Sequence, residues 1–266
     1  TLTRKYEEIF FNDLESLNIE RFAKTPRATE SISEMITLIE KMLENGTAYK
    51  SSDGVYFDIT KSKNYGKLAN LNLENTAKER IANDEYDKEN ARDFSLWKFY
   101  TEEDGEVSYD APFGKGRPGW HIECSAMSMT NLHTETIDIH TGGSDLIFPH
   151  HTNEIAQSEA VTGKTFVNYW MHSGFITVDG KKMSKSLGNI FTLQNLHEKN
   201  IDPISYRYFV LGAHYSTLLN FTWEALEGAD TTLKRLREKI SKLPDGGNVI
   251  AAKFNDVMHD DLNTPK

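Results

Sequence analysis

The 266-residue sequence has one cysteine and no long apolar run. The single cysteine, Cys124, excludes an internal disulfide and leaves three alternatives: a buried thiol, a nucleophile or a metal ligand. No stretch approaches the roughly 18 apolar residues of a membrane-spanning helix, and the polar start at residues 1–5 lacks the apolar core of a signal peptide. We therefore expect a cytoplasmic protein with no membrane partner.

The sequence also lacks an excess of basic residues, since its formal net charge is −10. This charge argues against broad, nonspecific nucleic-acid binding, although a local basic patch can act inside an acidic protein. We find no internal repeat and no low-complexity tract. The length predicts two or three structural units, because domains usually contain about 100–200 residues.

The first part of the chain reads as helices and a hairpin. Apolar spacing predicts an amphipathic helix at residues 4–17 and a second helix that begins after Thr29 or Ser31 and ends at Gly46. Segments 47–50 and 55–58 flank a turn sequence and predict a β-hairpin. We expect the polar stretch 60–92 to be mostly loop.

From Pro118 onward, strands and helices alternate, which is typical of an α/β fold. The expected elements are strands at 137–140 and 166–170, helices at 150–162 and 203–211, a hairpin from 175, a long helix capped by Thr222, a turn at 244–248 and a last helix.

The pentapeptide Lys182–Ser186 places two cations and two hydroxyls after the turn Asp179-Gly180. Ammonium groups and small hydroxyl donors suit the phosphates of a nucleotide. A solvated surface loop is the alternative, but this string would arise by chance roughly once in ten thousand chains of this length. The string is the signature of class I aminoacyl-tRNA synthetases.

A second pattern is compatible with a metal site, although the usual CxxC or HExxH spacing is missing. Cys124, His150 and Glu154 offer sulfur, imidazole and carboxylate, all of which zinc accepts. His150 and Glu154 are four residues apart, so one helical face can direct both toward one ion. Spacing does not exclude His151. The alternatives are a buried cysteine and histidines that only neighbour a helix start.

Three stretches resemble the cysteinyl-tRNA synthetase family, and the resemblance covers essentially the whole chain. They are GRPGWHIECSAM at 116–127, DIHTGGSDLIFPHHTNEIAQSEA at 138–160 and NYWMHSGFITVDGKKMSKSLGN at 168–189. A weaker match surrounds Arg207 and His214-Tyr215.

The resemblance implies ATP-dependent activation of L-cysteine to cysteinyl-adenylate and its transfer to tRNA(Cys), by a monomer that uses Zn²⁺ and Mg²⁺ with ATP. It also implies roles for the matched residues. Zinc would be bound by Cys124, His150 and Glu154, and Cys124 would also lie at the cysteine pocket, which Trp120 and His140 line. Gly143 and Asp145 would lie beside the adenosine of ATP, Lys185 would contact its phosphates, and Lys182 would join Lys185 in neutralising the leaving pyrophosphate.

The implied fold is part of a Rossmann-like α/β catalytic domain with an α+β connective insertion, followed by part of a helical bundle. The expected division is 1–20 as a helix leaving the first half of the catalytic fold, 21–115 as the insertion that contacts the tRNA acceptor end, 116–190 as the second half with the zinc site, 191–222 as a stem-contact region and 223–266 as the start of the bundle.

The sequence departs from the family pattern in several places. Thr141 stands where a glycine is usual, which would crowd a nucleotide, and Thr152 stands where an acid is usual, a change that we expect to be peripheral. A further cysteine ligand and an HIGH-type motif are absent, so we expect an internal fragment that is inactive or impaired alone. We expect His172 and His214 to be structural, hydrogen-bonded histidines.

Two other interpretations remain. One is the cysteine ligase of mycothiol synthesis, which uses the same adenylate chemistry and transfers cysteine to an amino-sugar amine. The other is a noncatalytic zinc-binding or RNA-binding module that retains the fold and has lost the chemistry.

Overall fold

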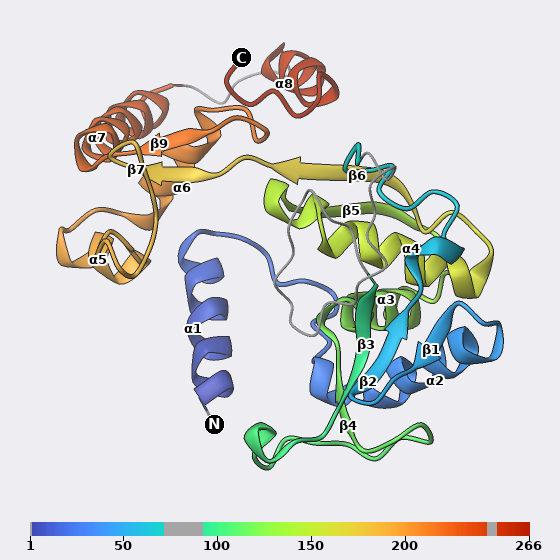
Figure 1. Cartoon of the computed structure of the whole chain (residues 1–266). Helices are drawn as coiled ribbons and strands as arrows, with labels where there is room; N and C mark the ends of the chain where they lie inside the picture. Colours follow the sequence, from blue (N-terminus) through green and yellow to red (C-terminus); the bar gives the residue numbers. More distant parts are fainter. Residues whose placement is uncertain (1, 72–92, 244–248) are drawn as a thin grey trace. The chain divides into compact units, whose positions relative to one another are not determined.

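A computed structural model describes residues 2–71, 93–243 and 249–266, without the side chains of 249–252. The chain forms two compact units, one from Lys24–Met171 and the other from Thr1–Ala23 together with His172–Lys266. No helix among the described residues is long and apolar enough to cross a membrane. Figure 1 shows the elements.

The Lys24–Met171 unit is built around an antiparallel sheet of four strands in the order β1-β2-β3-β4. Its elements are η1 (Ala28–Glu30), α2 (Ile32–Glu44), β1 (Ala48–Lys50), β2 (Gly54–Phe57), η2 (Ile59–Lys61), β3 (Phe94–Phe99), η4 (Glu102–Asp104), β4 (Gly116–Pro118), α3 (Trp120–Leu132), β5 (Ile137–Gly143), η5 (Ser144–Ile147), α4 (His150–Thr162) and most of β6 (Val167–Ser173).

The core of this unit follows from the apolar pattern. The α2 helix buries Met35, Ile39 and Met42 completely, at the spacing of one helical face. The rings of Phe57 and Phe94 stack across β2 and β3 with their centroids 5.1 Å apart. Figure 1 shows α2 and α3 behind these strands, so the sheet and the helices form two layers.

The β3 strand also positions the start of α3. Gly119 is the residue before the helix, and its N–H donates to the Leu96 carbonyl of β3 at 2.9 Å. A Cβ atom on Gly119 would lie 2.1 Å from the Ser95 carbonyl oxygen, so only glycine permits this close approach. The first turns of α3 are therefore fixed against the sheet.

The second unit is mostly helical. It contains α1 (Leu2–Ser16), β7 (Ile176–Val178), β8 (Lys181–Lys182), α5 (Leu193–Glu198), α6 (Pro203–Leu211), β9 (Leu219–Phe221), α7 (Trp223–Ile240) and α8 (Val249–His259). Its small sheet has the order β8-β7-β9, with β7 and β8 antiparallel and β7 and β9 parallel.

Local sequence explains the ends of these elements. The side chains of Asp202 and Thr222 accept hydrogen bonds from Ile204 N–H and Ala225 N–H and so cap α6 and α7. Between β7 and β8, Asp179 and Gly180 both have positive φ, at 49° and 72°, as a two-residue type I′ hairpin turn requires.

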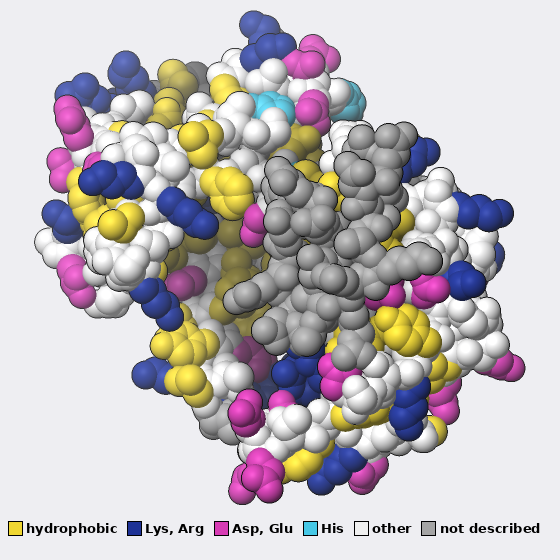
Figure 2. Space-filling view, in the orientation of Figure 1, with side chains coloured by type: hydrophobic (Ala, Val, Ile, Leu, Met, Phe, Trp, Pro, Cys, Tyr) yellow, Lys and Arg dark blue, Asp and Glu magenta, His cyan; other side chains and the backbone are white. Residues whose placement is uncertain are grey.

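Charged side chains of both signs cover the helices of this unit. Figure 2 shows Lys and Arg side chains interleaved with Asp and Glu over α5 and α7. Several are paired, as in Lys234 with Asp230 at 2.6 Å and Arg237 with Asp202 at 2.9 Å. The basic groups of this surface are thus partly neutralised within the unit.

Most of the predicted elements are confirmed. The first two helices, the first hairpin, the strands near 137 and 166, the helix at 150–162 and the capped helices α6 and α7 are all present. The predicted turn at 244–248 and most of the predicted loop 60–92 lie outside the described residues. The sequence analysis missed β3, β4, α3, α5 and β9.

Candidate functional site

Cys124, His150 and Glu154 come together between α3 and α4. One candidate donor atom from each lies within 4.8 Å of the others, and His150 and Glu154 are buried while Cys124 is partly exposed. Cys124 lies in the second turn of α3, and the other two share one face at the start of α4. The structure therefore brings together the three residues predicted to be metal ligands.

Glu154 divides its two carboxylate oxygens between different partners. Oε2 lies 2.9 Å from His140 Nε2. Oε1 is fully buried, has no N–H or O–H donor among the described residues and lies 3.6 Å from His150 Nε2. A buried carboxylate oxygen without a donor is costly unless a cation satisfies it, so this donor set fits a metal ion.

His151 belongs to a second group on the other side of Glu154. Its Nε2 lies 3.9 Å from Glu154 Oε2, and His140, His151 and Glu154 also have candidate donor atoms within 4.8 Å of one another. This group contains no sulfur, and its His140 is already hydrogen-bonded to the carboxylate. The group with Cys124 is the better match to the donors that zinc prefers.

Burial opposes ionisation of the thiol and protonation of the imidazoles at this site. Burial, followed by the nearby Glu154 and Glu123 carboxylates, raises the pKa of Cys124 to about 12. Burial also lowers the pKa of His150, and it lowers the pKa of His121 to about 3 with a further contribution from His150. Both imidazoles are therefore neutral at neutral pH.

Aromatic rings border the site. Trp120 stacks on His150 with ring centroids 4.4 Å apart, and its side chain remains 45 % exposed. Trp170 lies against both His140 and His151, with each pair of centroids 4.8 Å apart. The exposed indole of Trp120 thus covers the imidazole of His150, and the indole of Trp170 lies beside those of His140 and His151.

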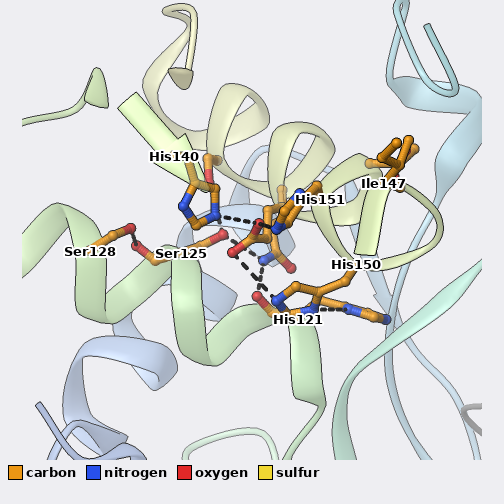
Figure 3. A network of polar contacts seen from close by, with 11 residues as sticks. His121, Ser125, Ser128, His140, Ile147, His150 and His151 are labelled. Atoms are coloured by element: carbon orange, nitrogen blue, oxygen red, sulfur yellow. Dashed lines mark hydrogen bonds and ion pairs between the residues drawn. The ribbon is translucent and has the colours of Figure 1, made fainter. Parts of the chain in front are cut away.

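A polar network holds α3 and α4 together beneath the site (Figure 3). Gln157 Nε2 donates to the His121 carbonyl at 2.5 Å and to Ser125 Oγ at 2.6 Å, while Ser158 Oγ donates to Ser125 Oγ at 2.9 Å. All four residues are buried. Because these bonds connect the two helices, they fix the positions from which Cys124 and His150 project.

The residues expected to lie beside the nucleotide, Gly143 and Asp145, are in the segment before α4. Asp145 is exposed, and a Cβ on Gly143 would lie 2.4 Å from Asp145 Oδ1. Thr141 is exposed. Thr152, expected to be peripheral, is instead buried, and its hydroxyl donates to the Ile147 carbonyl at 2.7 Å, so it fixes the turn into α4.

Lys182 and Lys185 belong to the other compact unit. Both are exposed and, within the described ranges, neither forms an ion pair. Their loop is held by Asn189, which accepts from Ser184 N–H at 2.9 Å and donates to the Lys182 carbonyl at 3.1 Å, and by Met183, which packs on the core. The backbone of the loop is thus held in place, while the ammonium groups of Lys182 and Lys185 are exposed to solvent.

The sequence analysis missed His121, whose Nδ1 lies 2.9 Å from His150 Nδ1. Its only signal was a polar side chain on α3 with Ser125 one turn later. His214 has the structural role that we expected, because its ring contacts Ser216 Oγ at 2.8 Å and the Asp261 carbonyl at 2.9 Å.

Comparison with known proteins gives a strong match. Residues 1–231 match the family described as tRNA synthetases class I (C) catalytic domain. A cysteine–tRNA ligase of Brachyspira hyodysenteriae is 48 % identical over 279 residues, covering 98 % of this chain and 59 % of the relative. One of Chlamydia muridarum is 53 % identical over 243 residues, covering 90 % of this chain and 51 % of the relative. The chain thus spans about half the length of these relatives.

The fold is also found among solved structures. A Mycobacterium tuberculosis methionyl-tRNA synthetase in complex with methionyl-adenylate has a TM-score of 0.66 and 16 % sequence identity, over 98 % of this chain and 67 % of that chain. At this identity the likeness concerns the fold alone. Together with the family match, it confirms the expected α/β class, a Rossmann-like class I synthetase catalytic domain with mixed helices and sheets.

Proposed function

Because the chain belongs to the family of class I (C) tRNA synthetase catalytic domains, we propose that it carries out part of the ATP-dependent activation of L-cysteine and its transfer to tRNA(Cys). The relatives quoted above bear the name cysteine–tRNA ligase. The observation that supports the proposal is the convergence of Cys124, His150 and Glu154, whose sulfur, imidazole and carboxylate would suit a thiophilic metal in a chain of this family.

In this proposal the substrate provides the nucleophile. The carboxylate of cysteine attacks the α-phosphorus of ATP, the bond to the β-phosphate bridging oxygen breaks, and pyrophosphate leaves with its electron pair. A ribose hydroxyl of the terminal tRNA adenosine then attacks the acyl carbon of the adenylate, the bond from that carbon to the phosphate oxygen breaks, and AMP leaves while the hydroxyl proton is released. No enzyme nucleophile is required, so positioning and electrostatics account for the acceleration.

Lys185, together with Lys182, would neutralise the charge that accumulates on the leaving pyrophosphate, with Mg²⁺ on the triphosphate. Support comes from the loop geometry: both ammonium groups are exposed and unpaired among the described side chains, while Asn189 and Met183 hold the backbone. A mobile ammonium on a fixed loop can follow a phosphate between ground state and transition state. Gly143 and Asp145 would lie beside the adenosine.

The three proposed ligands would also select the substrate. Serine differs from cysteine by one atom, and a pocket based on shape separates such near-isosteres by only about 10–200-fold. When bound, zinc supplies a preference for thiolate over hydroxyl. Trp120 and His140 would line the remainder of the cysteine pocket, consistent with the stacking of Trp120 on His150 and the contact of His140 with Glu154.

The remaining assignments follow the same proposal. Segment 21–115 would contact the tRNA acceptor end, 191–222 the stem of the tRNA, and 223–266 would begin a helical bundle. A cytoplasmic, monomeric enzyme is the form we infer.

The test combines two measurements on the full-length protein: zinc content and cysteine-dependent exchange of pyrophosphate into ATP. We expect Cys124→Ala to lose zinc and to lower the exchange rate by more than about 100-fold, because a ligand contributes at least as much as its supporting neighbours. Ser128→Ala is the matched control: Ser128 lies one turn further along α3, and its hydroxyl donates a hydrogen bond to the Ser125 carbonyl at 3.3 Å.

If the Cys124→Ala variant retained both zinc and exchange, the assignment would be wrong. The acceptor separates the alternatives: cysteinylation of tRNA supports the proposal, whereas transfer to an amino-sugar amine would support the mycothiol pathway ligase. Zinc binding without any exchange would favour a noncatalytic module.

A further inference from the structure

His121 is buried beside the proposed metal site and belongs to neither group of candidate ligands. Only 1 % of its surface is exposed, and its Nδ1 lies 2.9 Å from His150 Nδ1. Figure 3 shows the two rings facing each other through these atoms. The proposed function so far gives His121 no role.

The contact between the two ring nitrogens determines a proton arrangement. One nitrogen must carry the proton and the other must accept it. The other nitrogen of His150, Nε2, faces Glu154 Oε1 at 3.6 Å, within the group that includes Cys124. An imidazole binds a metal through a lone pair, so a liganding Nε2 requires that the His150 proton be on Nδ1. His150 then donates, and His121 Nδ1 accepts.

We propose that His121 is a positioning residue that accepts a hydrogen bond from His150 Nδ1–H and thereby keeps the lone pair of His150 Nε2 directed at the metal. The inference rests on the proposed metal site and extends it by one residue. In this arrangement the proton of His121 is on its own Nε2.

His121 is itself held in place. Its ring lies edge-on to Phe94, with centroids 5.6 Å apart and an interplanar angle of 85°, and its backbone carbonyl accepts from Gln157. On the His150 ring, Trp120 covers a face while His121 occupies an edge. The orientation of the His150 ring is therefore held on a face and at an edge before any metal arrives, which lowers the cost of binding.

Two substitutions at this position separate hydrogen bonding from packing. His121→Phe retains a ring against Phe94 and removes the acceptor. His121→Asn places an amide oxygen close to the position of Nδ1 and restores the acceptor with a smaller side chain. Phe94→Leu is the matched packing control, because it disturbs the other side of His121 and leaves its nitrogens unchanged.

The measurement is the zinc dissociation constant of each variant, by competition with a chromophoric chelator, with Co²⁺ absorption spectra to report ligand geometry. We expect His121→Phe to weaken zinc binding about 10–100-fold, the usual effect of removing a hydrogen-bond partner of a ligand. His121→Asn and Phe94→Leu should remain close to the unsubstituted chain, and Co²⁺ spectra should change only in His121→Phe.

Unchanged zinc affinity in His121→Phe would overturn the inference and leave the proposed metal site intact. Equal losses in His121→Phe and His121→Asn, or a similar loss in Phe94→Leu, would also overturn it, since packing would then explain the effect. If the unsubstituted chain bound no zinc, the metal site and this inference would both fail.

Discussion

At the scale of the residue, single side chains with two different partners organise this molecule. Glu154 presents Oε2 to His140 and leaves Oε1 for His150 and Cys124. Asp104 likewise accepts from Arg117 Nε at 2.9 Å through one oxygen and from Thr101 N–H at 2.8 Å through the other. Because the two oxygens of each carboxylate have different partners, substituting one partner tests one oxygen at a time.

The hydrogen bond from Arg117 is the main reason that the pKa of Asp104 falls from its ordinary value of 3.8 to about 2. Because the pKa is lower in the folded chain, Asp104 stabilises the fold fully above about pH 4 and loses that contribution as the pH falls toward 2. We expect Arg117→Gln to bring the pKa back toward 3.8, measured by NMR titration of the carboxyl carbon.

Asp110 serves as an internal reference in the same titration, because it lies in the same loop and no salt bridge to it is found among the described residues. A pKa for Asp104 that stayed near 2 in the Arg117→Gln variant would show that the Thr101 backbone contact, rather than the guanidinium, lowers it.

At the scale of the element, the start of α3 depends on the absence of a side chain at Gly119. A Cβ there would meet the Ser95 carbonyl oxygen at 2.1 Å, so Gly119→Ala must move α3 away from β3. We expect a loss of about 1–3 kcal/mol in the free energy of unfolding, as for other overpacked sites, together with weaker zinc binding, because α3 carries Cys124. Urea denaturation and chelator competition measure the two effects.

Gly228→Ala is the control, because a Cβ at this position in α7 would meet no atom of the described residues within 4 Å apart from its chain neighbours and the backbone of its own helix. This change should leave zinc binding unaltered and should not destabilise the chain, since alanine favours helix over glycine. If Gly119→Ala were as stable as Gly228→Ala, the close approach to β3 would not constrain α3.

The contrast between α2 and α3 explains how much of the fold the sequence could predict. The α2 helix has a clear apolar face that ends in Met42, so its position could be read from spacing. The α3 helix buries His121 and Ser125 beside Ile122, and this mixture hides its periodicity. Its polar side chains are satisfied by α4, a partner that local patterns do not reveal.

The same reasoning applies to the site. Cys124, His150 and Glu154 could be found because their residue types suit zinc and because they match the motifs of a known family, and the structure brings them together. His121 could not, because one histidine near a helix start is not distinctive and its contact with His150 exists only once α3 packs on α4.

At the scale of the whole molecule, the proposed zinc ligands and the Lys182–Ser186 loop belong to different compact units. We therefore expect their effects to be separable. Lys185→Gln should lower cysteine-dependent pyrophosphate exchange by about 10²–10³-fold, as for the loss of one charge-stabilising donor, and should leave zinc content unchanged. Cys124→Ala should affect both.

Lys181→Gln is the matched control for that experiment, because Lys181 is an exposed lysine of β8 that precedes the pentapeptide. Loss of zinc in Lys185→Gln would contradict the separation, and normal exchange would remove Lys185 from the proposed machinery.

The stacking of Trp120 on His150 also gives the site an optical signal. Trp120 is 45 % exposed and in ring contact with a proposed ligand, whereas Trp97 is completely buried in the core of the same unit. Indole emission depends on the polarity and charge of its surroundings, so occupation of the site should change the fluorescence of Trp120 and leave that of Trp97 constant. Trp120→Phe should reduce the change to the part that comes from Trp170, whose ring lies against His140 and His151 beside the site. Metal and substrate binding would then be measurable without any added label.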